Sequence, residues 1–255
     1  MYLRLVRLHI REGSLWQFRE HYESHILPAL EATDGCLYAA LLQPLARTAN
    51  EDCDSLTLWE SVAQANVYVE SGRYDELLDG ADPYLASATE WKADPFRPPS
   101  GQRPPLPDPT VEVYPVEVAR QAPGGGETNA VFLRVVDHRV EPARFEELMR
   151  TYEDEVAPAL LETPGCLAAY LVEGLRGRSQ ALSVTFWKDE ASAVRYESEG
   201  RFDALVAKMR PYLSGLYQWR LSLAPSAEGR GVSGGDLDVS GYTVLAARRI
   251  RKGES

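Results

Sequence analysis

Two arginines lie in apolar stretches where a charge needs a partner. Arg4 stands in the stretch YLRLVRLHI near the start of the chain, and Arg134 stands in VFLRVVDHR. Burying an isolated charge costs much free energy, so each arginine must pair with an acid or bind a ligand. The pairing alternative is an internal salt bridge, to Glu23 and Glu153 or to the other half of the chain. The ligand alternative makes both arginines candidate binding groups.

A second pattern gathers polar and aromatic side chains on one face of a strand. Residues 55–60 read SLTLWE and residues 183–188 read SVTFWK. Successive side chains of a strand point to opposite faces, so Ser, Thr and Trp share one face in each stretch. We expect the aliphatic face to lie under helices, together with Leu3, Leu5, Leu133 and Val135. The other face then lines a chamber suited to a planar, oxygenated organic ligand, formed by Arg4, Arg134, Thr57, Thr185, Trp59 and Trp187.

The aromatic and histidine candidates each have an alternative interpretation. Trp59 and Trp187 either stack on a ligand or plug the chamber by packing. His138, near the end of its strand, either points into the chamber as an acid–base group or is structural. His21 and His25 lie four residues apart in an expected helix, but they have no histidine counterparts in the second half of the chain and no third ligand is defined. No metal site is therefore predicted.

These patterns recur because the chain is an internal duplication. PALEATDGCL at 28–37 returns as PALLETPGCL at 158–167, and GRYD at 72–75 returns as GRFD at 200–203. Ordered matches that include glycine, proline and tryptophan are hard to obtain by chance. We therefore predict two copies of one domain. Their expected bounds are 1–120 and 131–248, with a Gly-rich linker at 121–130 and a C-terminal tail at 249–255.

Each copy has the pattern of a ferredoxin-like βαββαβ unit. In the first copy, alternation and helical spacing predict strands at 2–10, 36–43, 55–60 and 111–119 and helices at 14–33 and 61–79. A further strand lies between 44 and 54, or merges with the 55–60 strand through a hairpin. The second copy repeats the pattern, with strands at 131–139, 183–188 and 241–248 and a helix at 189–209. A sheet with helices on one face leaves its other face apolar and in need of cover. The prediction is an α+β fold in which two units pack sheet to sheet as an intramolecular dimeric α/β barrel.

Composition restricts the partners and the compartment. The formal charge is −11 over 255 residues, and no basic stripe with interleaved aromatics is present. Nucleic acid and anionic membrane surfaces are therefore not expected as partners. Three cysteines without a close pair argue against a disulfide framework. With no signal-peptide pattern and no apolar run of about 18 residues, we expect a cytoplasmic protein.

The combined motifs resemble a known family. In each copy a helix ends in P-A-L-x-x-T-x-G-C, a strand carries S-x-T-x-W, and a later helix carries Y-x-x-x-G-R-[YF]-D. Together they resemble the antibiotic biosynthesis monooxygenase domain of the dimeric α/β-barrel superfamily, here in tandem. The resemblance covers nearly the whole chain apart from the linkers. It is more specific for fold than for activity.

The resemblance implies a cofactor-independent reaction. Family members that oxidise polyketide phenols use neither metal nor flavin, because the protein stabilises a phenolate that reduces dioxygen itself. For this chain it implies a small aromatic phenol and dioxygen as partners and no cofactor. Arg4 and Arg134 would supply charge, which lowers the pKa of a phenol in a dry pocket, with Trp59 and Trp187 as aromatic walls. The implied hydroxyl partners are Tyr22, Tyr152, Tyr68 and Tyr196.

Two other functions stay open on the same fold. One is a non-catalytic small-molecule-binding or structural protein. The other is a haem-binding protein, which the resemblance disfavours because Leu78 and Val206 stand near the place of the axial histidine in the haem-degrading branch, and neither side chain ligates iron. Whether one copy or both carry a working pocket, and whether two such chains pair further as a homodimer, also stays open.

Overall fold

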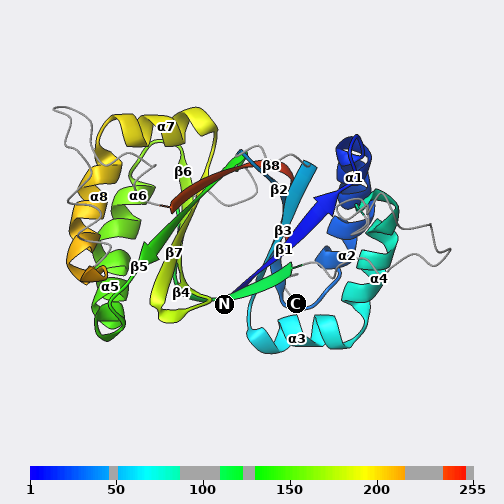
Figure 1. The fold of residues 1–255 in the computed structure, drawn as a ribbon, viewed down its shortest axis with the longest axis horizontal. Coiled ribbons are helices and arrows are strands. Elements are labelled where there is room, and N and C mark those ends of the chain that lie inside the picture. The colour runs from blue at the N-terminus through cyan, green and yellow to red at the C-terminus, as the bar shows by residue number, and fades with distance from the viewer. Residues whose placement is uncertain (46–50, 87–109, 123–129, 216–237, 251–255) are drawn as a thin grey trace, which may run out of the picture. The chain divides into compact units, whose positions relative to one another are not determined.

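The computed structural model describes residues 1–45, 51–86, 110–122, 130–215 and 238–250. Most of the linker predicted at 121–130 and most of the predicted tail lie outside these residues. The elements follow the predicted βαββαβ order twice (Figure 1). The first copy contains β1 (Tyr2–Ile10), α1 (Leu15–His21), α2 (Leu27–Glu31), β2 (Cys36–Pro44), β3 (Glu51–Trp59), α3 (Val62–Glu70), α4 (Arg73–Ala81) and β4 (Thr110–Gln121). The second contains β5 (Phe132–Arg139), α5 (Phe145–Thr151), α6 (Ala157–Leu161), β6 (Cys166–Gly174), β7 (Gly177–Trp187), α7 (Glu190–Ser198), α8 (Arg201–Met209) and β8 (Asp238–Arg249).

The first predicted helix of each copy contains a π turn. It spans Tyr22–Ile26 between α1 and α2, and Tyr152–Val156 between α5 and α6. The amide of Leu27 bonds to the carbonyl of Tyr22, five residues earlier. A proline follows each turn, at positions 28 and 158. Proline offers no amide hydrogen and clashes with the carbonyl four residues before it, so a wider turn at this point accommodates it.

The second predicted helix of each copy is broken in two by a glycine. Gly72 (φ 80°) separates α3 from α4, and Gly200 (φ 75°) separates α7 from α8. Only glycine adopts these left-handed angles readily. The continuous helices expected at 61–79 and 189–209 are therefore wrong at this point, and α4 and α8 are elements of their own.

Strands β2 and β3 form the antiparallel hairpin that was one of the two expected alternatives. In the second copy β7 pairs with both β5 and β6. The fourth strand of each copy also pairs with the other copy: β4 pairs with β6 and, in the closed strand order, neighbours β1 of its own copy, whereas β8 pairs with β5 of its own copy and neighbours β2. A strand edge offers the same unpaired amide and carbonyl groups whichever copy it belongs to, so the alternation of side chains cannot reveal these pairings between the copies.

The two compact units each contain residues from both copies. One comprises 1–3 and 113–244, and the other comprises 4–112 and 245–255. The compact units therefore do not coincide with the repeat bounds of 1–120 and 131–248. The hydrogen-bonded order is β1-β3-β2-β8-β5-β7-β6-β4 and closes an eight-stranded barrel. The predicted α+β barrel is confirmed.

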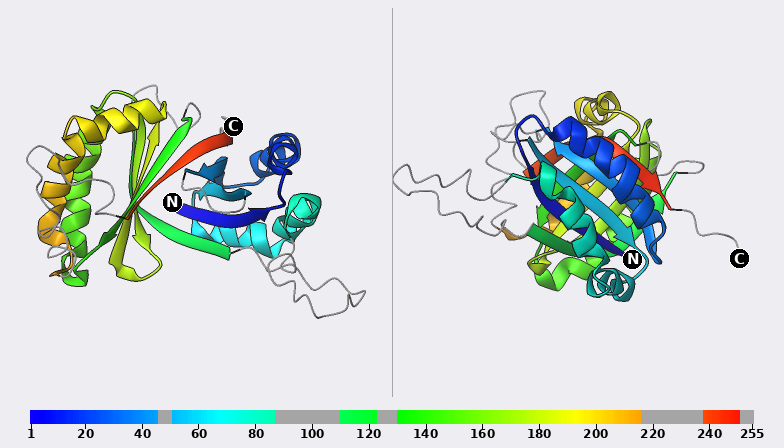
Figure 2. Two further views of the ribbon diagram at one scale, coloured as in Figure 1. Left: turned by 45° about the horizontal axis from the view of Figure 1, so that its top comes forward. Right: turned by 90° about the vertical axis from the view of Figure 1, so that its right-hand side faces the viewer.

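Within each unit the helices cover one face of the strands (Figures 1 and 2). The prediction of which face they cover is wrong. Ser55 and Thr57 lie under the helices of their own copy, where the Tyr22 hydroxyl is 2.8 Å from Ser55 Oγ. Leu56 and Leu58 alternate with them on the opposite face and are buried there. The helices bring tyrosine hydroxyls to the sheet, so the polar strand residues find hydrogen-bond partners there.

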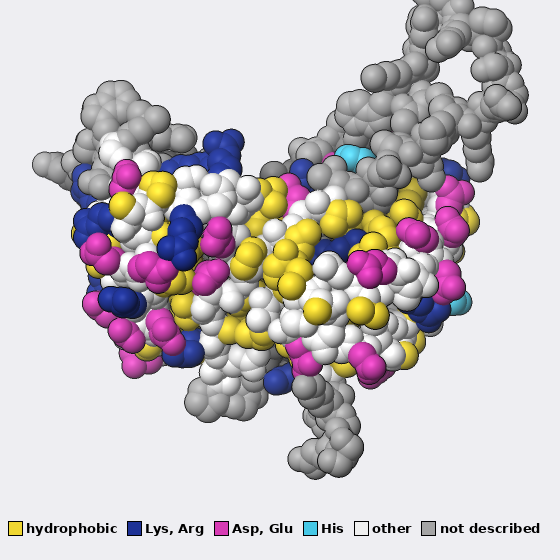
Figure 3. Space-filling model, turned by 90° about the horizontal axis from the view of Figure 1, so that it is seen from below, with side chains coloured by type: hydrophobic (Ala, Val, Ile, Leu, Met, Phe, Trp, Pro, Cys, Tyr) yellow, Lys and Arg dark blue, Asp and Glu magenta, His cyan; other side chains and the backbone are white. Residues whose placement is uncertain are grey.

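The described part of the surface carries no continuous basic area on the face shown in Figure 3, where acidic and basic side chains are interspersed. Among the described residues no helix has the length and hydropathy to cross a membrane, and no group of three or more metal-ligating side chains is present. Cys36, Cys53 and Cys166 are buried, and none of them forms a disulfide within the described part of the chain. Burial raises the pKa of the Cys36 and Cys166 thiols to about 12.

Candidate ligand pockets

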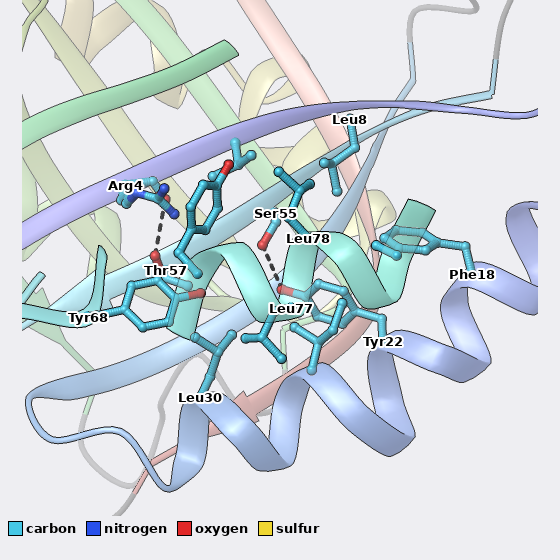
Figure 4. Close-up of a pocket in the computed structure, with 14 residues that line it drawn as sticks. Arg4, Leu8, Phe18, Tyr22, Leu30, Ser55, Thr57, Tyr68, Leu77 and Leu78 are labelled. Atoms are coloured by element: carbon cyan, nitrogen blue, oxygen red, sulfur yellow. Dashed lines mark hydrogen bonds between the residues drawn. The ribbon is translucent and has the colours of Figure 1, made fainter. Parts of the chain in front are cut away.

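A pocket in the first copy lies between the strands and the helices that cover them (Figure 4). It contains Arg4 from β1, the two hydroxyl residues of β3, and tyrosines from the π turn and the second pair of helices. The remaining lining is aliphatic, apart from Phe18. The polar and aromatic members are Arg4, Ser55, Thr57, Tyr22, Tyr68 and Tyr74. Five of these were predicted or lie on the predicted strand face, and Tyr74 is new.

Arg4 is a buried cation without an acidic partner in the described part of the structure. It is 5% exposed, and its guanidinium carbon lies 4.2 Å from the ring centre of Tyr74 and 5.8 Å from that of Tyr68. The salt bridge to Glu23, which the sequence left open, is not formed, because Glu23 pairs with Arg19. Cation–π contacts stabilise the charge only in part.

Two tyrosines of this pocket, Tyr22 and Tyr68, stay protonated. Burial raises the pKa of Tyr22 and of Tyr68 well above the usual value, although Arg4 opposes the shift at Tyr68. A buried phenol that keeps its proton can donate a hydrogen bond to an anion. The pocket therefore combines one positive charge with neutral hydroxyl donors.

The second copy has an equivalent pocket. Arg134, Thr185, Ser183, Tyr152 and Tyr196 occupy the matching places. The Tyr152 hydroxyl is 2.9 Å from Ser183 Oγ, which repeats the contact of the first copy. The duplication therefore reproduces the site as well as the fold.

The charge of the second pocket is balanced. The Arg134 guanidinium contacts a carboxylate oxygen of Glu197 at 2.7 Å. The predicted alternative partner, Glu153, instead pairs with Arg120. Glu197 has Val69 as its counterpart in the first copy, which is why Arg4 lacks a carboxylate. Only a comparison of the two copies, position by position, reveals this difference in the sequence.

His138 lines the second pocket and is 5% exposed. Its counterpart in the first copy is Leu8. Burial, and secondarily the charge of Arg134, lowers the pKa of His138 to about 4. The imidazole is therefore neutral at physiological pH.

Trp59 and Trp187 are fully buried and are not among the residues that line the pockets. Their indole N–H groups donate to Thr57 and Thr185, at 2.9 and 2.8 Å. The ring of Trp59 lies 5.0 Å from that of Tyr68. Both tryptophans pack beneath the helices of their own copy, so they neither plug a chamber on the other face nor wall the pocket.

Side chains fill most of both pockets. The cavities measure about 40 Å³ in the first copy and about 30 Å³ in the second. Both exceed the roughly 10–15 Å³ that one water needs, and both are far below the roughly 300–1,000 Å³ of established ligand pockets. In the first copy Tyr74, Leu77 and Leu78 of α4 are only half-buried. A ligand with an aromatic ring therefore has to displace such side chains.

Comparison with known families agrees with this architecture. Residues 132–208 match the family model for antibiotic biosynthesis monooxygenase (ABM). The matched residues lie within the second copy and are less than a third of the chain. The first copy repeats the element order, the pocket residues and the π turn of the second, so the chain carries the domain architecture twice. No curated protein matches the sequence.

Solved structures with the same fold cover nearly the whole chain. A candidate monooxygenase of Fusobacterium nucleatum subsp. nucleatum aligns with a TM-score of 0.66 at 9% identity, over 97% of this chain and 94% of its own. One of Lactobacillus acidophilus aligns at 0.65 and 9% identity, over 97% and 95%. An anthrone oxidase-like protein aligns at 0.50 and 14% identity, over 98% and 94%. At these identities the likeness shows the fold alone.

Proposed function

We propose that the first-copy pocket binds a small aromatic phenol as its phenolate, and that the bound anion is oxidised by dioxygen without a cofactor. The observation that carries the proposal is Arg4, a buried cation with no carboxylate partner among the described residues. An anionic ligand supplies the missing charge. Binding is expected to lower the pKa of the bound phenol, because a nearby positive charge favours the ionised form.

The neighbouring hydroxyl groups complete the anion site. Tyr68 and Tyr22 remain protonated because burial raises their pKa values. Each can donate a hydrogen bond to the ligand oxygen. Preorganised donors of this kind stabilise developing negative charge best where water is excluded.

The proposed reaction balances without a further reductant. The phenolate gives an electron to dioxygen, and the two radicals combine at an activated ring carbon to form a peroxide. Loss of the C–H proton and cleavage of the O–O bond leave a carbonyl oxygen on the ring and release water. In total, a ring C–H and the phenol O–H plus one O₂ become a quinone and one H₂O.

The comparisons support this class of reaction. The ABM family model matches residues 132–208, and one structure of the same fold belongs to an anthrone oxidase-like protein. Activated phenols of the anthrone and hydroquinone type are therefore the first substrates to test.

The experiment measures oxygen uptake by the intact protein with a panel of anthrones and hydroquinones. We expect uptake that Arg4→Met reduces at least tenfold, because the variant keeps the bulk and loses the charge. Arg178→Met is the matched control, since Arg178 is half-exposed and remote from this pocket in sequence. No uptake with any member of the panel, or equal uptake by Arg4→Met, would contradict the proposal.

A second candidate function is non-catalytic, either small-molecule binding or a structural role. The small size of the cavities favours the structural role. Saturable binding of phenols without oxygen uptake would support small-molecule binding without catalysis. The haem-binding alternative predicts a Soret shift on titration with haem, and its absence would remove that alternative.

A further inference from the structure

We infer that the second-copy pocket is a separate site for a neutral, hydroxyl-bearing aromatic molecule, which it recognises through the Nδ1 atom of His138. The site differs from that of the first copy in charge, in polar groups and in shape. It rests on the described geometry of the second copy alone and does not depend on the oxidation proposed for the first.

The first argument is the unmet hydrogen bond of His138. Nδ1 is buried and has no partner among the described residues, and the ring lines the cavity. Buried polar atoms in folded proteins nearly always have a partner, so this atom needs an explanation. The fold itself does not require the histidine, because Leu8 takes its place in the first copy.

The second argument is the electrical balance of the pocket. Glu197 compensates Arg134 at 2.7 Å, and the imidazole of His138 is neutral at physiological pH because burial and Arg134 lower its pKa to about 4. An anion entering this pocket would find its one lining arginine, Arg134, already paired with a carboxylate. A neutral ligand avoids repulsion by that carboxylate.

The third argument is the chemistry of the lining. Apart from its polar and aromatic side chains, the pocket is bounded by aliphatic residues and a methionine, among them Val136, Val156, Leu160, Leu205 and Met209. Such a lining suits an apolar ring. A hydroxyl group both donates and accepts, so it satisfies Nδ1 in either tautomer of the neutral imidazole. The ligand class is therefore a small phenol in its protonated form.

A flexible side chain, that of Met209, can make space for the aromatic ring of the ligand. Met209 narrows this cavity where the first copy has Ala81. An unbranched thioether changes rotamer easily and adapts to a ligand. Met209→Ala should therefore enlarge the site and tighten binding of a one-ring phenol.

The test uses p-cresol as the neutral probe and p-toluate as its anionic counterpart, without dioxygen. In the intact protein labelled with ¹⁵N-histidine, saturation with p-cresol should shift the His138 Nδ1 resonance, and p-toluate should not. His138→Leu, which installs the residue of the first copy, should weaken p-cresol binding about tenfold. His138→Gln keeps a hydrogen-bonding side chain and should retain part of it.

A charge variant provides the complementary result. Glu197→Val reproduces the first copy and should let p-toluate bind at the second pocket. An unshifted His138 resonance at p-cresol saturation, or unchanged affinity in His138→Leu, would overturn the inference. If no phenol binds saturably, water alone satisfies Nδ1 and the inference fails as well. The binding readout needs no turnover, so these failures are distinct from failure of the oxidation in the first copy.

Discussion

At the scale of single residues, the two copies differ most in how they treat a buried arginine. Arg134 is paired with Glu197, whereas Arg4 rests on aromatic rings. A buried ion pair that is broken on one side leaves a costly charge, so the unpaired member of a duplicated pair is the better candidate for ligand binding. One position, occupied by Val69 or Glu197, decides this difference.

Val69→Glu should convert the first pocket to the paired state of the second. Val69 is 39% exposed and the Glu197 side chain 38%, so the new carboxylate is placed comparably. We expect affinity for an anionic phenol to fall about tenfold, which corresponds to roughly 1.4 kcal/mol. Calorimetric titration measures it. Val67→Glu, at 63% exposure on the same helix, is the control, and an equal loss there would contradict the explanation.

His138 should make the free energy of unfolding fall as the pH is lowered into the acid range. Its pKa in the folded state is about 4, against 6.5 for an ordinary histidine. Between these values the unfolded chain binds more protons, so stability rises with pH across this window and is lost on acidification. Complete protonation costs about 3 kcal/mol by the conversion of 1.36 kcal/mol per pH unit.

The variant His138→Leu removes this titration. The free energy of unfolding, measured by urea denaturation from pH 4 to 7, should vary less in the variant than in the unaltered chain. A pH profile of unchanged slope would mean that His138 does not carry the effect.

At the scale of elements, two glycines position the second helix pair against the strands. Gly35 and Gly165 have positive φ angles and lie directly before β2 and β6. A Cβ atom on Gly165 would lie 2.5 Å from the Cβ of Ser192 in α7. Helix α7 therefore packs directly against Gly165. The lack of a side chain at this position lets the helix lie close to the end of the sheet that contains Trp187.

Gly165→Ala should destabilise the protein more than Gly200→Ala does. Both glycines have positive φ angles, but a Cβ on Gly200 meets nothing within 4 Å. The Gly200 variant carries only the backbone strain of about 1–2 kcal/mol. The Gly165 variant adds a steric clash, which we expect to cost about 1–3 kcal/mol more. Chemical denaturation midpoints measure both, and equal losses would show that α7 moves away at no cost.

The positions of the strands could be predicted from the sequence better than the chemistry of the pockets. Alternation located β1, β3 and β5 because each contains a short run in which one face is aliphatic, such as Leu56 and Leu58 in β3. It did not tell which face the helices cover, since helix side chains such as Tyr22 make polar strand residues acceptable beneath them. Glu197 was missed because its counterpart, Val69, breaks the repeat.

At the scale of the whole molecule, the pairing of edge strands between the copies sets which segments must fold together. β4 belongs to the first copy by sequence, and its residues pair with β6 in the second. The strands of the first copy are neighbours in the order β4-β1-β3-β2, and the outer two, β4 and β2, neighbour β6 and β8 of the second copy. Cutting the chain at the repeat boundary would therefore leave sheet edges unpaired, which invites aggregation.

A disulfide can test directly whether β4 pairs with β6. Val118 and Leu171 are registered partners across β4 and β6, and directly opposed strand residues have the Cα spacing of about 4.5–5.5 Å that a disulfide tolerates. The double variant Val118→Cys/Leu171→Cys should crosslink under mild oxidation, and mass spectrometry of the digest should find the bridge. Leu41 is the first-copy counterpart of Leu171 and lies on β2, which does not neighbour β4 in the strand order. Val118→Cys/Leu41→Cys should therefore stay reduced, and a bridge in this variant, or none in the first, would contradict the described strand order.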